Sequence, residues 1–308
     1  MANAILTAKH FTDEAAAFAH VEARLWPDGP VCPHCGAAKD HIGKLTGKSA
    51  RMGLHKCYAC RREFTVRVGS IFEDSHLPLH LWLQVIHLMC ASKKGISTRE
   101  IQRLLNCSMK TAWHLTHRIR EVMAPAKGAG PLGGEGVVLE VDETFIGPEG
   151  GRKLGRLPQP KAAVFGLVER HGKMRSIHIQ NVGHKTLQEA LEKNANTKSH
   201  LMTDELNFYG RVGWNFASHG TVNHSKQEYA RGTVSTNTIE GAFSVLKRGL
   251  YGVYQRVSEA HLQRYLAEFD FRYSNREKLG VNDVSRAAIA LKQAKGKRLT
   301  YRTIGAGQ

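Results

Sequence analysis

The sequence predicts an α/β domain, in which helices flank a mixed sheet, preceded by a small cysteine-bearing unit and a helical unit. Two periodicities predict the sheet and its helices. Apolar runs of strand length cover 137–145, 162–169, 173–180 and 200–203. Helical apolar spacing covers 185–194, 238–250 and 258–273, and three segments between 76 and 123. A stretch rich in Gly and Pro at 124–136 indicates a linker before the α/β domain.

The expected division has six segments. A basic loop is predicted at 147–160, inside the α/β domain. From Arg286 onward the chain holds six Lys or Arg and no acid, so this tail either follows phosphates or is a solvated basic end. The expected boundaries are 1–30 for an N-terminal helical segment, 31–75 for the cysteine-bearing unit, 76–123 for the helices, 124–136 for the linker, 137–281 for the α/β domain and 282–308 for the basic tail.

The charge of the chain indicates a polyanionic partner. Lys and Arg total 44 against 27 Asp and Glu, which gives a formal net charge of +17. Nucleic acid is the leading candidate, because neutralising phosphates releases counterions. No apolar stretch is long enough for a membrane span, the first residues do not resemble a secretory signal, and six Cys are too few for a disulfide scaffold. We therefore expect a cytoplasmic protein that faces DNA or RNA and no membrane.

Two C-x-x-C pairs predict a zinc site in the segment 31–75. They are Cys32 with Cys35 and Cys57 with Cys60, separated by positions 36–56. Each pair can turn two thiolates toward one tetrahedral ion, so the four cysteines predict one structural Zn²⁺ in a zinc ribbon. Gly36 permits a tight turn after the first pair. A redox or incidental set of cysteines is the alternative.

The segment 76–123 contains a candidate helix-turn-helix. Ser97 and Glu100 fit a capping box, and Ser108 can cap a second helix after a short turn. The second helix turns apolar residues inward, namely Ala112, Leu115, Ile119 and Val122. Its outer positions are polar or basic and predict DNA contacts, namely Lys110, Thr111, His114, His117, Arg118 and Arg120. A plain helical hairpin inside a core is the alternative.

Acidic residues follow the predicted strands. Glu140 and Asp142 share one face of the first strand, while Leu139 and Val141 share the other. Carboxylates on an apolar strand are costly unless they bind metal or protrude at the strand end. Asp204 ends the strand 200–203, a common place for a site residue, although a turn or a helix cap is the alternative.

A third acid lies on the helix predicted at 238–250. Glu240 and Lys247 are two turns apart on one face, so a carboxylate can hold a metal while the lysine holds a DNA phosphate. The alternative is that Asn237 and Glu240 form a capping box. Together with Asp142 and Asp204, Glu240 suits a ribonuclease H-like site with two Mg²⁺ or Mn²⁺ ions about 4 Å apart. One ion would lower the pKa of the attacking water or hydroxyl, and the other would stabilise the leaving oxygen.

Short motifs between Phe11 and about Asn275 resemble those of a known family. They are WPDG at 26–29, CPHC at 32–35, KCYAC at 56–60, GSIF at 69–72, KGIS at 94–97, KTAW at 110–113, EVDET at 140–144, MTD at 202–204, TNTIE at 236–240 and KR at 247–248. With these motifs the chain resembles the bacterial insertion-sequence transposases of the DDE class that carry an N-terminal zinc ribbon.

The resemblance implies a ribonuclease H-like catalytic domain and a set of site residues. Asp142, Asp204 and Glu240 would be metal ligands and Lys247 a phosphate contact. His224 and Arg248 would contact DNA, and His224 would alternatively have a structural role. Glu140 and Glu143 are the alternative first acids. The implied partners are double-stranded DNA, as inverted repeats and target, and further copies of the chain in a homodimer or larger assembly near the nucleoid.

Three functions are compatible with these features. An active transposase would cut the element end and join its 3′-hydroxyl to target DNA, two phosphoryl transfers that one site can serve. A non-catalytic DNA-binding regulator would use only the ribbon and the helices. A ribonuclease H-like nuclease would cut without transfer. The presence of all three acids favours a catalytic role.

Overall fold

A computed structural model describes residues 4–47, 49–126, 128–147, 161–205 and 207–299. The chain forms two compact units, Met1–Ala124 with Asn282–Gln308, and Pro125–Val281. We call them the helical unit and the sheet unit. The helical unit is therefore assembled from two separate stretches of chain.

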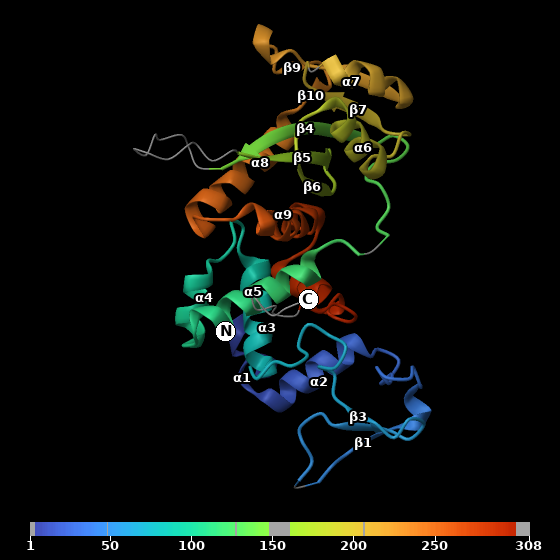
Figure 1. Ribbon diagram of the computed structural model, residues 1–308, viewed down its shortest axis with the longest axis vertical. Helices are drawn as coiled ribbons and strands as arrows, with labels where there is room; N and C mark the ends of the chain where they lie inside the picture. Colours follow the sequence, from blue (N-terminus) through green and yellow to red (C-terminus); the bar gives the residue numbers. More distant parts are fainter. Residues whose placement is uncertain (1–3, 48, 127, 148–160, 206, 300–308) are drawn as a thin grey trace, which may run out of the picture. The chain divides into compact units, whose positions relative to one another are not determined.

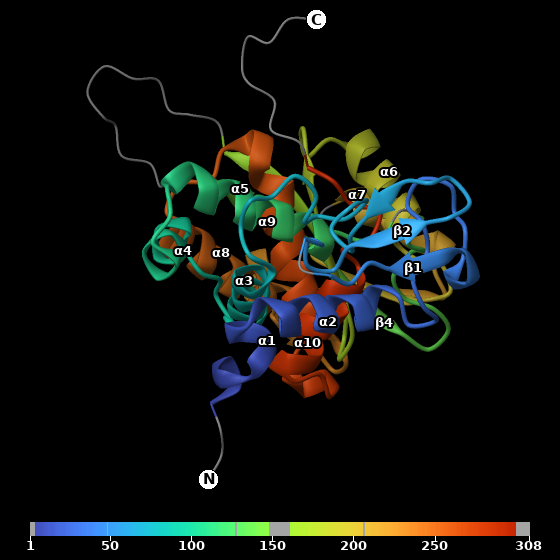
Figure 2. The same ribbon diagram turned by 90° about the horizontal axis from the view of Figure 1, so that it is seen from below.

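The helical unit has a core of three helices. α2 (Glu14–Leu25), α3 (Leu79–Ala91) and α10 (Asp283–Lys292) pack together, preceded by η1 (Ile5–Thr7) and α1 (Lys9–Thr12). Figure 2 shows α10 beside α2 and α3. Buried Trp82 and Leu291 belong to this core, which requires the last helix of the chain.

The placement of α10 corrects the prediction of a basic tail at 282–308. Arg286 is buried, donates to the Cys90 carbonyl at 2.7 Å and pairs with Asp283 at 2.6 Å. Lys297 donates to the carbonyls of Glu121 and Ala124 at the end of α5, both at 2.8 Å. These cations serve the fold of the helical unit, so they are not available as a row of phosphate contacts.

The predicted helix-turn-helix is confirmed as a pair of helices, α4 (Thr98–Leu105) and α5 (Met109–Met123). The capping box of Ser97 and Glu100 is formed, and Ser108 caps α5 by accepting from the Thr111 N–H. Asn106 between them adopts a left-handed conformation at φ +46°.

The prediction that the polar and basic positions of α5 form an exposed outer face is wrong beyond the first turns of the helix. His117, Arg118 and Arg120 are buried, because α3, α4 and α10 all pack against α5. The Arg118 guanidinium donates to the Glu73 carbonyl and lies 5.4 Å from the centre of the Trp82 ring. Arg118 is therefore a core residue, whereas Lys110 is exposed and Thr111 and His114 are half-buried.

The cysteine-bearing segment forms a small antiparallel sheet, β1 (Ile42–Lys44), β2 (His55–Cys57) and β3 (Glu63–Phe64), after η2 (Lys39–His41). Its apolar core is small. Phe64 packs with Cys32 and Cys57, and Trp26 and Ile42 lie against them. So few apolar groups indicate that this sheet needs another source of stability.

The sheet unit contains a five-stranded mixed sheet in the order β6-β5-β4-β7-β8 (Figure 1). β4 (Val138–Ile146), β5 (Ala162–Glu169) and β6 (Met174–Ile179) are antiparallel, and β7 (His200–Thr203) and β8 (Ser218–Thr221) continue parallel to β4. In chain order the strands run 3-2-1-4-5. This mixed sheet agrees with the expected ribonuclease H-like fold.

Helices cover both faces of this sheet. α6 (His184–Asn194) and α7 (Asn207–Val212) share one core with Leu139 and Val141 of β4. α8 (Asn237–Gly249) and α9 (Glu259–Ser274) share the other with Val164 and Val168 of β5. The remaining elements are η3 (Gly213–Asn215), η4 (His224–Lys226), β9 (Ala230–Arg231), β10 (Val234–Ser235), η5 (Leu250–Tyr254) and η6 (Glu277–Leu279).

The predicted linker at 124–136 is only partly a linker. Leu132 is buried in the core of the sheet unit, and its backbone exchanges hydrogen bonds with Asn194 and Asn196. The predicted basic loop at 147–160 lies, apart from Gly147, outside the described residues. None of the helices in the described part of the chain has the length and apolar content needed to cross a bilayer.

Candidate functional site

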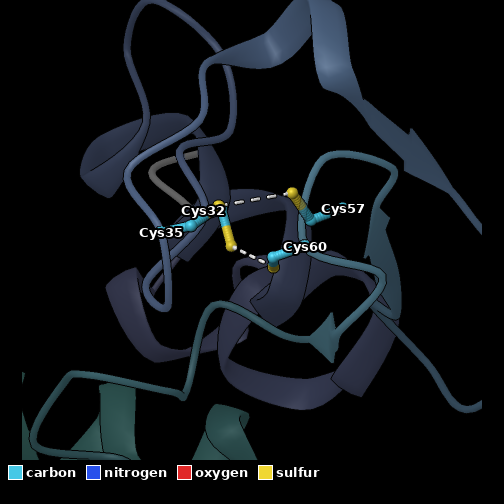
Figure 3. A group of neighbouring side chains, drawn as sticks. All are labelled: Cys32, Cys35, Cys57 and Cys60. Atoms are coloured by element: carbon cyan, nitrogen blue, oxygen red, sulfur yellow. Dashed lines mark hydrogen bonds between the residues drawn. The ribbon is translucent and has the colours of Figure 1, made fainter.

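The four predicted zinc ligands converge in the ribbon (Figure 3). The Sγ atoms of Cys32 and Cys60 are 3.7 Å apart, and those of Cys35 and Cys57 are 3.6 Å apart. A disulfide needs about 2.05 Å, whereas the edges of a ZnS₄ tetrahedron with bonds of about 2.3 Å measure about 3.8 Å. The spacing therefore fits four thiolates around one zinc ion and excludes a disulfide.

Local backbone geometry forms the two knuckles. Gly36 has φ +77°, as expected for the tight turn, and its N–H donates to the Cys32 carbonyl. The Cys60 N–H donates to the Cys57 sulfur and lowers the pKa of that thiol to about 7. The thiolate is the form that binds zinc, so this N–H favours the ligating form of Cys57. The redox alternative has no support in this geometry.

The three predicted acids lie on three elements of the sheet unit. Asp142 is in the middle of β4, Asp204 directly follows β7, and Glu240 is in the first turn of α8. β4 and β7 are hydrogen-bonded neighbours, and α8 packs against β4. Their ligand atoms are less tightly gathered than the sulfurs. Among the described residues, only the cysteines place three or more such atoms within 4.8 Å of one another.

Asp142 has the electrostatic environment of a site residue. Burial, together with the carboxylates of Asp204 and Glu240, raises its pKa to about 7. The Glu143 N–H donates to Asp142 Oδ1 at 2.8 Å and, with His224, acts in the opposite direction. Neighbouring carboxylates that repel one another in a half-buried place offer hard oxygen ligands to a divalent cation.

A glycine lets α8 approach the strand of Asp142. Gly166 on β5 is the register partner of Asp142. A Cβ atom there would lie 2.5 Å from Phe243 Cζ and 3.2 Å from Ile239 Cδ1 of α8. The helix that carries Glu240 therefore packs on bare backbone beside the first acid.

Glu240 is not part of a capping box. Thr236 is the N-cap residue of α8, and no side chain within the helix caps it. The Glu240 Oε1 atom instead accepts from Thr236 Oγ1 at 2.8 Å and lies 3.3 Å from His224 Nε2. The capping interpretation of Asn237 and Glu240 is therefore wrong, and the carboxylate faces the His224 loop.

Glu140 is excluded as a metal ligand by its own contacts. Its side chain is fully buried, and both oxygens accept hydrogen bonds from the start of α8 and from Arg170. Glu143 faces α7, where the Tyr209 hydroxyl donates to it. Burial, together with the charges of Asp142 and Asp204, raises the pKa of Glu143 to about 7, so Glu143 lies beside the acids.

Comparison with known proteins assigns a domain within each unit. Residues 131–274 match the model of the ISXO2-like transposase domain, and residues 12–63 match that of the transposase zinc-ribbon domain. The chain therefore carries two domains of insertion-sequence transposases, the catalytic-type domain and the zinc ribbon. It is also 25% identical to an "Uncharacterized protein in transposable element ISH50" from Halobacterium salinarum. That alignment spans 282 residues, 86% of this chain and 92% of the relative.

Two residues of the transposase that the sequence did not single out link its acids. Glu205 follows Asp204 and accepts from the backbone N–H of His224 at 2.9 Å and from Ser225 Oγ at 2.6 Å. These bonds hold the His224 loop between the second and third acids. Arg170, in the turn after β5, pairs with Glu140 of β4 and donates to the carbonyls of Thr233 and Ser235, so it joins the strand of the first acid to the segment before α8. Neither has a sequence signal, because both act through contacts between segments far apart in the chain.

The remaining predicted DNA contacts of the transposase have mixed surroundings. Lys247 is half-buried two turns along α8 from Glu240, about 10 Å by helix rise, and Arg248 beside it is exposed. The His224 imidazole lies beside the Glu240 carboxylate, which favours a role in supporting the site over a contact with DNA. Tyr251, one turn beyond Lys247, bonds through its hydroxyl to Gly147 at the end of β4.

Proposed function

We propose that the transposase binds the inverted repeats at its element ends, cuts DNA there in a metal-dependent reaction, and joins the freed 3′-hydroxyl to target DNA. Asp142, Asp204 and Glu240 would hold two Mg²⁺ or Mn²⁺ ions. The observation that supports this most directly is that the three acids lie on adjoining elements, β4, the end of β7 and the first turn of α8. The raised pKa of Asp142, to which burial and the two other carboxylates contribute, agrees with this placement.

The spread of the three carboxylates is compatible with this role. A site for two cations does not need all three carboxylates around one ion, so Asp142, Asp204 and Glu240 would hold the pair between them. When bound, the cations would activate the attacking oxygen and stabilise the leaving one. Lys247 would hold a phosphate beside the site, and His224 would orient the Glu240 carboxylate.

The zinc ribbon and the first turn of α5 would supply DNA binding. Lys110, Thr111 and His114 lie at the start of α5, the part of a recognition helix that contacts base edges. Arg118 is not included, because it is buried. We also propose a homodimer or larger assembly on DNA, since two element ends must be joined.

Asp142→Asn tests the catalytic proposal, because the amide keeps the shape and removes the charge. Incubated with Mg²⁺ and duplexes carrying the DNA that flanks the gene, the wild type should nick them and join the 3′ end to a plasmid. Asp142→Asn should lower both yields at least about 100-fold and leave the gel-shift affinity unchanged.

Three outcomes separate the alternatives. Glu189→Gln, on the exposed side of α6, is the charge-matched control and should retain wild-type yields. Nicking without joining by the wild type would indicate a nuclease. Binding with no cleavage would indicate a regulator, and wild-type cleavage by Asp142→Asn would refute the assigned acid.

A further inference from the structure

Glu140 is a buried carboxylate with every oxygen engaged. Its side chain is 0% exposed, although a charge in the interior is costly unless fully paired. Oε2 accepts from the N–H groups of Thr238 at 2.8 Å and Ile239 at 3.1 Å. Oε1 accepts from Thr238 Oγ1 at 2.8 Å and from Arg170 Nε at 2.9 Å.

These bonds cap α8 from another element. The first N–H groups of a helix have no partner within it and carry a partial positive charge. No side chain of α8 or its N-cap supplies one, and Glu140 of β4 does so across 98 and 99 positions of sequence. The start of α8 is therefore fixed to one point on β4.

Arg170 extends the connection to the segment before α8. Its guanidinium pairs with Glu140 Oε1 at 2.8 Å and donates to the carbonyls of Thr233 at 2.8 Å and Ser235 at 3.2 Å. Its own backbone N–H donates to Val138 of β4. One ion pair thus joins β4, the turn after β5, and the approach to α8.

The two ends of this connection are next to the proposed metal ligands. Glu140 and Asp142 are two positions apart on the same face of β4, about 7 Å along the strand. Ile239, whose N–H Glu140 holds, directly precedes Glu240. A shift of α8 would therefore break the Glu140 bonds before it moved Glu240 away from Asp142.

We propose that Glu140, with Arg170, is a positioning residue that sets the separation of the Asp142 and Glu240 carboxylates before cations bind. This inference rests on the proposed metal site. A buried ion pair adds little stability beyond what apolar packing would give. The main effect of the pair of Glu140 and Arg170 is therefore to fix the position of α8 relative to β4. Groups that orient metal ligands typically contribute 10- to 100-fold to metal affinity.

The test is calorimetric titration of the zinc-loaded, full-length protein with Mn²⁺, in the absence of DNA. Glu140→Gln should weaken Mn²⁺ binding by about 10-fold or more. Glu268→Gln is the matched control. Glu268 is a fully buried glutamate paired with Arg272 on α9, far along the chain from the acids, and this variant should bind Mn²⁺ within about twofold of wild type.

Thr238→Val keeps the proposal testable if Glu140→Gln does not fold. It removes one bond to Glu140 and keeps the side-chain shape, and it should weaken Mn²⁺ binding by a smaller factor, with thermal melting near that of wild type. The positioning role would be overturned if Glu140→Gln and Glu268→Gln both lost Mn²⁺ affinity in the same proportion to their loss of melting temperature.

Asp142→Asn separates this inference from the proposed function. Loss of Mn²⁺ binding in Asp142→Asn with wild-type binding in Glu140→Gln and Thr238→Val would overturn the positioning role and leave the metal site in place. Wild-type binding in Asp142→Asn would overturn the metal site itself, and the inference with it. Loss in Asp142→Asn and Glu140→Gln, with binding kept in Glu268→Gln, supports both.

Discussion

At the scale of single residues, the contact between Gly166 and α8 constrains the position of the helix that carries Glu240. Gly166→Ala would push a methyl group into the Phe243 ring, at 2.5 Å from Cζ. Such overpacking typically costs about 1–3 kcal/mol. We expect a lower melting temperature, and a larger loss of cleavage than of DNA binding, because α8 must move from β4.

The control for this prediction is on α8 itself. Gly241→Ala adds the same methyl group where nothing lies within 4 Å. Removing a glycine from a helix interior should stabilise by about 0.5–1 kcal/mol. Equal melting temperatures and cleavage yields for the two variants would contradict the packing argument.

Asp270 predicts a pH dependence of stability away from the acids. It is buried on α9 and accepts from the N–H of Ser176 at 2.6 Å and from its hydroxyl at 2.7 Å. Burial raises its pKa from 3.8 to about 7, although the Ser176 bonds oppose the rise. The folded state therefore holds this proton more tightly, and stability is lost as pH rises from about 4 to about 7.

Asp270→Asn should remove this loss. The amide can accept from the Ser176 N–H and donate to its hydroxyl, so both bonds survive without a charge. At pH 8 we expect the free energy of unfolding of the variant to exceed that of wild type by on the order of a few kcal/mol, and its melting temperature to be higher. At pH 4.5 the two melting temperatures should be close. A difference in melting temperature that does not change with pH would refute the shift.

At the scale of elements, the zinc ribbon should depend on its metal. Its core is little more than Phe64 and two of the ligands, too little apolar surface to stabilise a three-stranded sheet. Cys57→Ser should abolish stoichiometric zinc in the purified protein, expose the ribbon to protease, and reduce binding to end DNA by 10-fold or more in gel shifts.

Cys107→Ser is the control for the ribbon, because Cys107 is half-buried in the turn between α4 and α5 and is not a ligand. It should retain zinc and DNA binding. Unchanged binding by Cys57→Ser would remove the ribbon from end recognition while leaving the transposase assignment intact.

At the scale of the whole molecule, what sequence predicted depended on how local each signal was. Capping at Ser97 and Ser108, the strands from β4 to β7 and the cysteine pairs are all specified by neighbours in the chain. β8, with the short polar sequence SHGT, has no apolar alternation and was missed. It is a strand because β7 pairs with it along its length.

The errors came from contacts that the sequence does not display. Arg118 follows a polar helical face, yet α3 and Glu73 enclose it. The segment 282–308 was predicted to be a basic tail, yet its apolar residues Ala290 and Leu291 are buried in the core of the helical unit. For the candidate site, the sequence indicated three acids and offered Glu140 only as an alternative first acid. In the fold, both carboxylate oxygens of Glu140 accept hydrogen bonds that fix the start of α8.

The discontinuity of the helical unit has a consequence for synthesis. A ribosome has made all of 125–281 before it reaches α10, so the sheet unit emerges whole while the helical unit still lacks a core helix. Translation that stops just after position 281 would leave the apolar side of α3 uncovered in the nascent polypeptide. The α4–α5 pair is therefore made early, but the unit that supports it is completed only once α10 has been made.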